Sequence, residues 1–412
     1  RFLSVAAGIV AVVLVYRLAR WAAGETAGRL ALLVAALSPF WLAESQETRM
    51  YTLGFALLTA AALAQTRSGR GGQTAFIVLS ALALLTHYNA VFILAAWYAW
   101  WGLTALLAAD RWMRLKGLFL RGLSTAILIA PVAPIALRQI PDYANPNLNP
   151  PGPLAYLWAN WTGHLAGYAW ESDWLAFLHA DSWWPWSILA LGVLGLLIFH
   201  LPRPREDAWT SAQKVGFLLA WLLGGLALYY AAVVDRGAFN IRYAGFVTPA
   251  LYALLGVGLA GLGRLGRWLP WLAAGVLVVG LVPADRADLA DPRFFREDTA
   301  GLAAWLQSHA GPGDVIFVDQ KYPFGFYYQR YAIEPTEEPT GPEAAPARYL
   351  FVDINTIDQA LTRWAGEARR VYWVVWFESD TDPRGAVTFL LEKYGTLAEQ
   401  MNFRGYWVSG WD

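Results

Sequence analysis

Three short polar stretches interrupt the apolar part of this sequence, and they carry the side chains that could do chemistry. They are ESQETRMY at 44–51, THYN at 86–89 and DRGAFNIRY at 235–243. An arginine guanidinium binds phosphate oxygens at two points, whereas carboxylates and histidine transfer protons. If the fold brings the stretches together, they predict a site for an anionic, phosphate-bearing substrate. The candidates are Glu44, Glu47 and Arg49 in the first stretch, His87 and Tyr88 in the second, and Asp235, Arg236, Asn240, Arg242 and Tyr243 in the third.

Each stretch also has a structural interpretation. The first would be a charged turn in which Arg49 extends toward lipid headgroups. The second would hold a hydrogen-bonded structural histidine, which is the commoner role of an isolated His. The third would be a solvated turn with one Asp–Arg pair. Both interpretations stay open for every stretch as long as the sequence is considered alone.

The composition indicates what kind of protein must position these residues. Of the 412 residues, 57% are hydrophobic and 15% are charged, against about 25% charge in an average soluble domain. Residues 1–283 hold 19 basic and 11 acidic side chains, and residues 284–412 hold 12 and 20. We therefore expect a membrane-embedded body at 1–283 and a soluble domain at 284–412. The balanced net charge gives no indication of nucleic acid binding, and the absence of cysteine excludes internal disulfides and cysteine metal sites.

Ten apolar stretches have about the length at which a helix crosses a bilayer. We expect spans at 2–19, 27–43, 50–65, 74–86, 88–108, 118–137, 183–201, 214–234, 241–262 and 268–283. Alternate loops hold fourteen Lys and Arg residues and the intervening loops hold four. Because positive charge stays on the cytoplasmic side, the three polar stretches and the C-terminal domain are expected on the extracytoplasmic side.

A long outer loop at 138–182 is rich in tryptophan, which is typical of a segment in the headgroup layer. We expect its tryptophans and those just after it to be interface anchors; the alternative is that some of them stack on a sugar or an isoprenoid. The acidic residues and histidines of this loop have no metal-ligand spacing, so we expect them on the surface, and Asn160 in NWT has the form of a glycosylation acceptor. The tryptophans are Trp158, Trp161, Trp170, Trp174, Trp183, Trp184 and Trp186, and the polar residues are His164, Glu171, Asp173, His179 and Asp181.

The C-terminal part alternates helical and strand patterns. TAGLAAWLQSHAG at 299–311 has helical spacing, and DVIFVD at 314–319 is a short strand-like run. ARYLFVD and VYWVVWF repeat the strand pattern, with a helix-like INTIDQALTRWAG between them and AVTFLLEKYG after them. This alternation predicts a small α/β domain with a largely parallel sheet. It contains no nucleotide-binding or metal motif.

The series as a whole resembles bacterial glycosyltransferase family 39, whose members are relatives of protein O-mannosyltransferases and aminoarabinose transferases. The resemblance rests on RFLSVAAGIVAVVLVYRLAR, a span ending in SPF, ESQETRMYTLGFALLTAAALA, LLTHYNAVFIL, NIRYAGFVTPALYALLGVGLAGL and FREDTAGLAAWLQSHAGPGDVIFV, in this order. It implies a GT-C fold in a bacterial inner membrane, with an extracytoplasmic active site. It also implies inverting transfer of a sugar from a polyprenyl-phosphate donor to a lipid, glycan or protein acceptor. The residues matched to donor or acceptor binding are Arg49, Tyr51, His87, Tyr88, Arg242 and Tyr243.

One part of the family pattern has no counterpart here. In the family the catalytic carboxylate lies on the first outer loop, which would precede Arg1. We therefore expect the first helix, its outer loop and the general base to precede this sequence, with Glu47 as a weak substitute inside it. The resemblance implies no certain cofactor, and it leaves the need for a divalent metal open.

A different class of function remains as an alternative, namely a flippase or transporter of lipid-linked sugars. Transporters usually bind their substrate at mid-membrane, on broken helices related by an internal repeat. The expected spans hold few charges at mid-depth and no repeat at a fixed period is visible, which favours the enzyme. A scaffold without activity is a third possibility.

Overall fold

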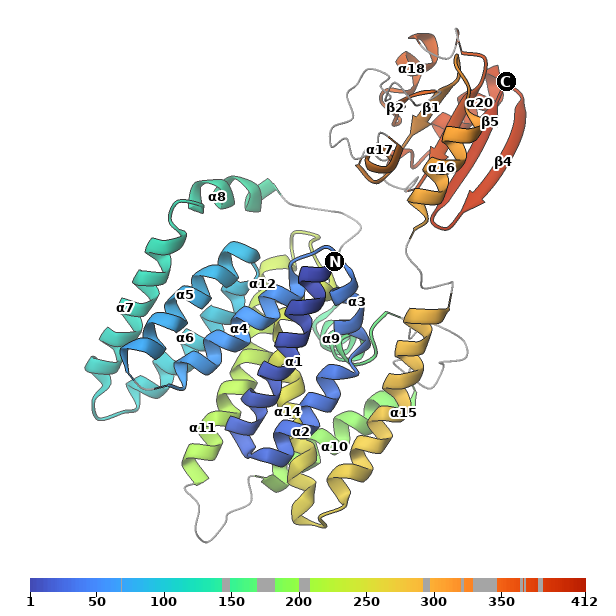
Figure 1. Cartoon of the computed structure of the whole chain (residues 1–412). Coiled ribbons are helices and arrows are strands. Elements are labelled where there is room, and N and C mark those ends of the chain that lie inside the picture. The colour runs from blue at the N-terminus through green and yellow to red at the C-terminus, as the bar shows by residue number, and fades with distance from the viewer. Residues whose placement is uncertain are drawn as a thin grey trace. The chain divides into compact units, whose positions relative to one another are not determined.

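The structure is a computed structural model whose chain divides into two compact units, Arg1–Phe294 and Phe295–Asp412 (Figure 1). The last helix of the first unit, α15 (Leu269–Ala290), continues through Pro283, beyond the boundary expected at residue 283. The residues described are 1–67, 69–142, 149–168, 182–199, 208–291, 297–319, 322–328, 347–363, 366, 368–376 and 381–412. Trp170, Glu171, Asp173, Trp174, His179 and Asp181 of the long loop lie outside them.

Every expected span overlaps a helix of the first unit, because long apolar runs satisfy their backbone hydrogen bonds internally. These helices are α1 (Phe2–Ala23), α2 (Glu25–Ala36), α3 (Pro39–Gln46), α4 (Tyr51–Gln65), α5 (Arg70–Thr86), α6 (Ala90–Leu106), α7 (Arg111–Ile129), α8 (Ala133–Asp142), α10 (Trp183–Phe199), α11 (Ala208–Leu219), α12 (Gly225–Val233), α13 (Ile241–Ala244), α14 (Thr248–Gly261) and α15. A π-helical turn (Ala220–Gly224) joins α11 to α12. One further helix, α9 (Pro153–Ala166), lies in the long loop.

The count of ten spans is not confirmed. By length and composition, three helical segments of the described chain can cross a membrane, and two bent pairs raise the number to five. The three are Phe2–Ala23, Ser211–Val233 and Ile241–Arg264, and the pairs are α2 with α3 and α7 with α8. Helices α4, α5, α6 and α10 are apolar but have 15 to 17 residues, fewer than the ~20 that span a bilayer without tilt or thinning.

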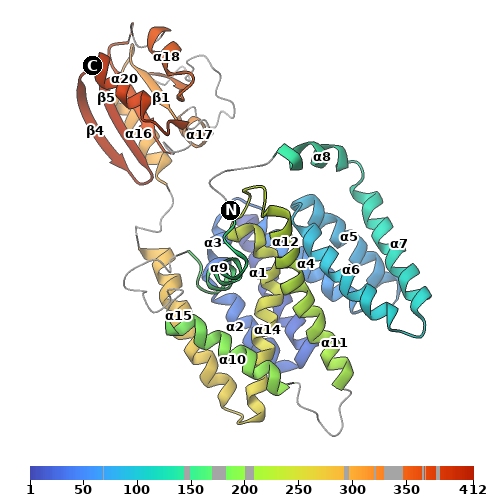
Figure 2. The same cartoon turned by 180° about the vertical axis from the view of Figure 1, so that it is seen from behind.

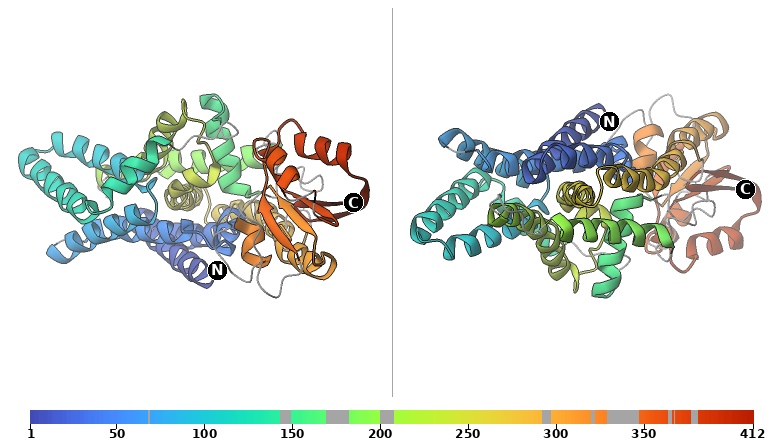
Figure 3. Two further views of the ribbon diagram at one scale, coloured as in Figure 1. Left: turned by 90° about the horizontal axis from the view of Figure 1, so that it is seen from above. Right: turned by 90° about the horizontal axis from the view of Figure 1, so that it is seen from below.

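Helix α14 forms the centre of the first unit and is almost entirely buried. Glycines allow its backbone to approach α10 closely, since a Cβ at Gly195 would collide with the carbonyl oxygen of Gly258. Close crossings of this kind are typical of small residues at membrane helix interfaces. Helix α14 also contacts α2, and the rear view shows α14 beside both α2 and α10 (Figure 2). Viewed end-on, α7 and α8 lie at the edge of the unit (Figure 3), and only Leu118 and Thr125 of α7 are buried.

The described residues of the second unit form a five-stranded sheet with the order β2-β1-β3-β5-β4. Strands β1 (Val315–Val318), β2 (Arg348–Phe351) and β3 (Val371–Val375) are parallel, as expected. The sequence patterns did not predict the antiparallel pair β4 (Leu397–Phe403) and β5 (Tyr406–Trp411), so the sheet is mixed. The helices are α16 (Thr299–His309), α17 (Tyr322–Tyr328), α18 (Ile357–Arg363) and α20 (Ala386–Tyr394). Two apolar clusters form its core, one with residues of α16 and α17 and the other with residues of α18 and α20.

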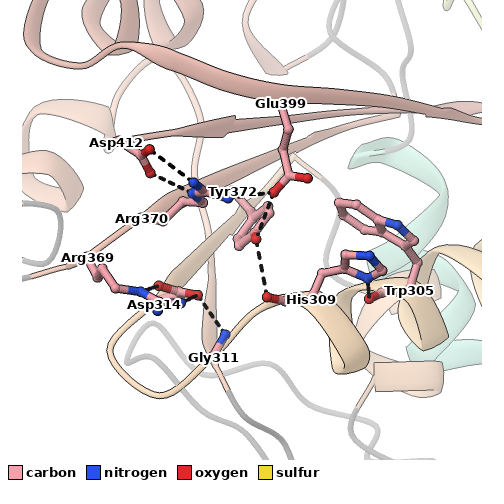
Figure 4. Close-up of polar contacts among 9 residues, drawn as sticks. All are labelled: Trp305, His309, Gly311, Asp314, Arg369, Arg370, Tyr372, Glu399 and Asp412. Carbon is pink, nitrogen blue, oxygen red and sulfur yellow. Dashed lines mark hydrogen bonds and ion pairs between the residues drawn. The ribbon is translucent and has the colours of Figure 1, made fainter.

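A polar network fastens the antiparallel strands to the parallel ones (Figure 4). Arg370, just before β3, donates to both carboxylate oxygens of Asp412 at 2.6 and 3.0 Å and to Glu399 of β4 at 2.8 Å. Tyr372 also donates to Glu399, at 3.0 Å. The side chains of Arg370 and Tyr372 are thus bonded to Asp412 and Glu399, and we assign the network a structural role.

Candidate functional site

Helix α3 carries the first group of candidate residues to one end of the helical unit. Ser38 caps the helix by accepting a hydrogen bond from the Trp41 backbone N–H at 3.1 Å, and Pro39 fits the first helical position. The axis bends by 53° between α2 and α3. Glu44 in the last full turn is completely buried, and Glu47 ends the helix with extended backbone.

The carboxylate of Glu47 lies between two arginines from different parts of the chain. Arg49 Nε is 3.1 Å from one oxygen and Arg242 Nη1 is 3.6 Å from the other. Asn240 positions Arg242 by capping α13, because its side chain accepts from the Arg242 N–H at 3.0 Å. The Arg242 side chain is 22% exposed and that of Arg49 is 53% exposed. Two of the three polar stretches therefore meet as a half-buried pair of guanidinium groups.

The remaining stretch, THYN at 86–89, joins them through aromatic rings. The His87 ring centroid lies 5.7 Å from that of Tyr51 and 6.1 Å from that of Tyr243, and Phe246 packs on His87 at 5.0 Å. Burial lowers the pKa of His87 to about 4, so its imidazole is neutral at neutral pH. Its Nδ1 accepts from the Asn89 N–H at 3.1 Å, which fixes the ring in the turn between α5 and α6. We call Glu44, Glu47, Arg49, Tyr51, His87, Arg242 and Tyr243 the rim cluster.

Tyr88 has a different environment from the other candidates. Its hydroxyl donates to Gln139 of α8 at 3.1 Å. This contact joins the turn between α5 and α6 to the bent pair α7–α8, and we leave Tyr88 out of the rim cluster.

Two residues of the long loop at 138–182 reach this region, and sequence reasoning missed both. Tyr168 donates to Glu44 at 2.8 Å, and its ring centroid lies 5.9 Å from the Arg242 guanidinium carbon. Burial raises the pKa of Tyr168, and the neighbouring Glu44 adds to the shift, so Tyr168 stays a hydrogen-bond donor. The expectation that His164 lies on the surface is wrong, because it is 1% exposed. No motif marks either residue, since their role depends on where α9 packs.

Other expectations for this loop are also corrected. Trp184 is completely buried and donates to the Val276 carbonyl at 2.8 Å, so it is a core residue and no interface anchor. Trp158 stacks on the half-exposed Trp186 with centroids 3.9 Å apart. Asn160 is 1% exposed and donates to the Tyr156 carbonyl, which leaves the NWT acceptor inaccessible in the folded chain.

Two buried hydrogen-bond donors, one in the rim cluster and one in the neighbouring Gln46, lack an acceptor among the described residues. The Nε of Arg242 and the Nε2 of Gln46 are both buried and meet no acceptor in the part of the chain that the structure describes. Buried donors without acceptors are costly, and the oxygens of an anion would satisfy them. No group of three or more His, Asp or Glu that could hold a metal ion occurs among the described residues.

Comparisons with known proteins agree with this architecture. No family model matches the sequence, and no curated protein matches it. The fold is similar to the crystal structure of ArnT from Cupriavidus metallidurans in the apo state, with a TM-score of 0.58 and 13% identity over 99% of this chain and 82% of that one. The structure of the same protein bound to undecaprenyl phosphate gives a TM-score of 0.55 and 13% identity over 99% and 83%. The chain thus shares the fold of this ArnT structure, with a helical unit followed by a small sheet.

Proposed function

We propose that this chain is a membrane glycosyltransferase that moves a sugar from a polyprenyl-phosphate donor to an acceptor hydroxyl on the extracytoplasmic side. One observation carries the proposal: Arg49 and Arg242, from separate segments, converge on a single carboxylate at one end of the helical unit. A structure of similar fold was solved with undecaprenyl phosphate bound. That protein supports a lipid phosphate as the substrate class here.

The proposed reaction breaks the bond between the anomeric carbon and the phosphate oxygen. The acceptor oxygen attacks this carbon in line, its proton passes to a carboxylate, and the polyprenyl phosphate leaves with the bonding electron pair. Negative charge grows on the phosphate as the bond breaks, and pre-positioned guanidinium groups stabilise that charge. A single displacement inverts the anomeric configuration.

Glu47 acts mainly as the counter-ion of the two arginines in this proposal. Its contacts with Arg49 and Arg242 hold both guanidinium groups in place before a phosphate arrives. For the general base, Glu47 stays the weak candidate within this chain. Tyr51, Tyr243 and the neutral His87 form an aromatic wall beside the arginines, which fits the sugar or the first isoprene unit of the donor.

The location of the charges favours an enzyme over a transporter of lipid-linked sugars. The rim cluster lies at helix ends, where α3 ends and α4 and α13 begin, and not halfway along a span. Beyond its first turn, α4 has one buried polar side chain among the described residues, that of Thr59. A site at helix ends suits chemistry at the membrane surface.

The test uses the full chain in liposomes with undecaprenyl-phosphate-linked hexoses and pentoses and a panel of lipid, glycan and peptide acceptors. We expect transfer of the sugar with release of undecaprenyl phosphate, and loss of donor binding in Arg242→Lys but not in Arg138→Lys, an exposed arginine of α8. Movement of the intact donor across the bilayer without cleavage would establish the transporter instead. Failure of the wild type to bind undecaprenyl phosphate would remove both.

A further inference from the structure

Helix α9 packs between the two segments that carry the charged residues of the rim cluster. It contacts α3 on one side and α13 on the other. A Cβ at Gly163 would lie 2.9 Å from the Ile241 side chain, and one at Gly167 would lie 2.7 Å from Pro39. Gly167 also has φ 72°, a conformation that favours glycine. Both approaches therefore depend on the absence of a side chain, at Gly163 within α9 and at Gly167 directly after it.

His164 connects α9 to the residue before Arg242. Its Nε2 is 3.0 Å from the Ile241 carbonyl oxygen, and because a carbonyl only accepts, Nε2 carries the hydrogen. The imidazole is 1% exposed and packs on Phe40 of α3 with ring centroids 4.8 Å apart. Without this donor, the Ile241 carbonyl would lose a partly buried hydrogen bond. The hydrogen bond thus fixes the backbone of α13 at the residue directly before Arg242.

A chain of buried hydroxyls continues from His164 to the start of α3. The Tyr252 hydroxyl donates to the His164 carbonyl at 2.8 Å. Its only hydrogen is then used, so the Ser38 hydroxyl donates to Tyr252 across 2.6 Å. Ser38 is also the cap of α3. The two segments that bring Glu47 and Arg242 together are consequently linked by one buried series of hydrogen bonds.

The other end of this loop segment reaches the rim cluster directly. Tyr168 holds Glu44 by a 2.8 Å hydrogen bond, and the Arg242 guanidinium lies over its ring. Tyr168 thus touches an acid from α3 and a cation from α13 at once. Its two contacts restrain the same pair of segments that His164 and Ser38 tie together deeper in the protein.

We propose that the segment 164–168 is the positioning element of the site: His164 sets Arg242 through the Ile241 carbonyl, and Tyr168 holds Glu44 and the guanidinium beside it. The inference rests on the proposed function, since it names the residues that keep the phosphate-binding arginine in place. His164 and Tyr168 are positioning residues, because they act on the substrate through Arg242.

The first experiment measures undecaprenyl phosphate binding to the detergent-solubilised full chain. We expect His164→Leu to weaken binding about five- to tenfold, the effect of losing one buried hydrogen bond. His164→Gln, which keeps an N–H donor near the same place, should restore most of the affinity. His309→Leu is the matched control, because His309 is an exposed histidine of α16. Equal affinities in His164→Leu and wild type would overturn the proposal.

The second experiment tests the geometry without any ligand. The chain has no cysteine, so the pair Gly163→Cys and Ile241→Cys gives an unambiguous cross-link, and the second change removes the side-chain atoms that the first would meet. We expect ready oxidation of this pair and slower oxidation when His164→Leu is added. An oxidation rate that does not depend on His164 would refute the positioning role.

The cross-link also separates positioning from simple loss of fold. In the triple variant, the disulfide ties α9 to α13 in place of the His164 hydrogen bond. Oxidation should therefore restore the affinity for undecaprenyl phosphate, and reduction should weaken it again. Absence of rescue would count against positioning. If the wild type binds no undecaprenyl phosphate, the proposed function fails, whereas the oxidation rates still decide whether His164 holds α13.

Discussion

Arg242→Lys isolates the shape of the cation from its charge. Arg242 contacts Glu47 through Nη1 at 3.6 Å, and its Nε is a buried donor without an acceptor among the described residues. A phosphate can therefore engage two edges of this guanidinium, whereas a lysine ammonium offers a single point of attachment. Arg49 is more exposed and already uses its Nε on Glu47, so it contributes less of the two-point geometry.

The magnitude follows from the number of bonds lost. One hydrogen bond between charged groups is worth about 1.5–3 kcal/mol, so the loss of one of two from the 22% exposed Arg242 should cost about 2 kcal/mol. That corresponds to an affinity for undecaprenyl phosphate about 30-fold weaker. For Arg49→Lys, whose side chain is 53% exposed, screening by water reduces the expected loss to about 1 kcal/mol, or about fivefold.

The assay is a titration of the full chain in nanodiscs with undecaprenyl phosphate, followed by native mass spectrometry. Arg138→Lys serves as control, because Arg138 is exposed on α8. Thermal unfolding of each variant shows whether the fold is intact. The reasoning fails if Arg242→Lys binds as tightly as the control, or if Arg49→Lys loses more affinity than Arg242→Lys.

Three further outcomes are expected. Burial lowers the pKa of His87 and His164 to about 4 from 6.5, so the unfolded chain takes up protons at a higher pH than the folded chain. The free energy of unfolding should therefore fall between pH 6.5 and 4, by on the order of 3 kcal/mol for each histidine. Thermal unfolding in detergent between pH 8 and 4 checks this, and a constant unfolding temperature would contradict it. Gly195→Ala places a methyl group on an α14 carbonyl and should lower the unfolding temperature strongly, whereas Gly275→Ala of α15 meets nothing within 4 Å and should not. Glu47→Gln removes the negative charge shared by the two arginines and should tighten undecaprenyl phosphate binding, with unchanged or weaker binding as the contrary result in the same titration.

Much of the helical unit is predictable because membrane helices are visible in the sequence as long apolar runs. The same runs do not reveal where a helix breaks, and the bends at Pro39 and between α7 and α8 turned expected single spans into pairs. Pro283, in contrast, lies inside α15 without ending it. A proline within an apolar run is thus compatible with a broken or a continuous helix, and packing decides between the two.

The charged part of the rim cluster was predictable for a related reason. Ionisable residues are rare in such a sequence, and their position at span ends indicated that Arg49 and Arg242 could meet. The positioning residues carry no such signal. His164 and Tyr168 lie in a loop rich in tryptophan and acidic residues, and only the packing of α9 on α3 and α13 gives them partners. In the second unit, the hairpin β4–β5 was missed because β4 is exposed along most of its length, so it lacks an apolar pattern.

The charge balance of the rim cluster bears on how a product would leave it. A polyprenyl-phosphate sugar is a phosphodiester with one negative charge, whereas the released polyprenyl phosphate carries about −1.5 to −2. Two arginines alone would therefore hold the product more tightly than the donor and slow turnover. Glu47 lies within 3.6 Å of both guanidinium groups and offsets part of their charge, which penalises the dianion more than the monoanion. Under the proposed function, the carboxylate of Glu47 beside Arg49 and Arg242 would thus help the site to release its lipid after each transfer.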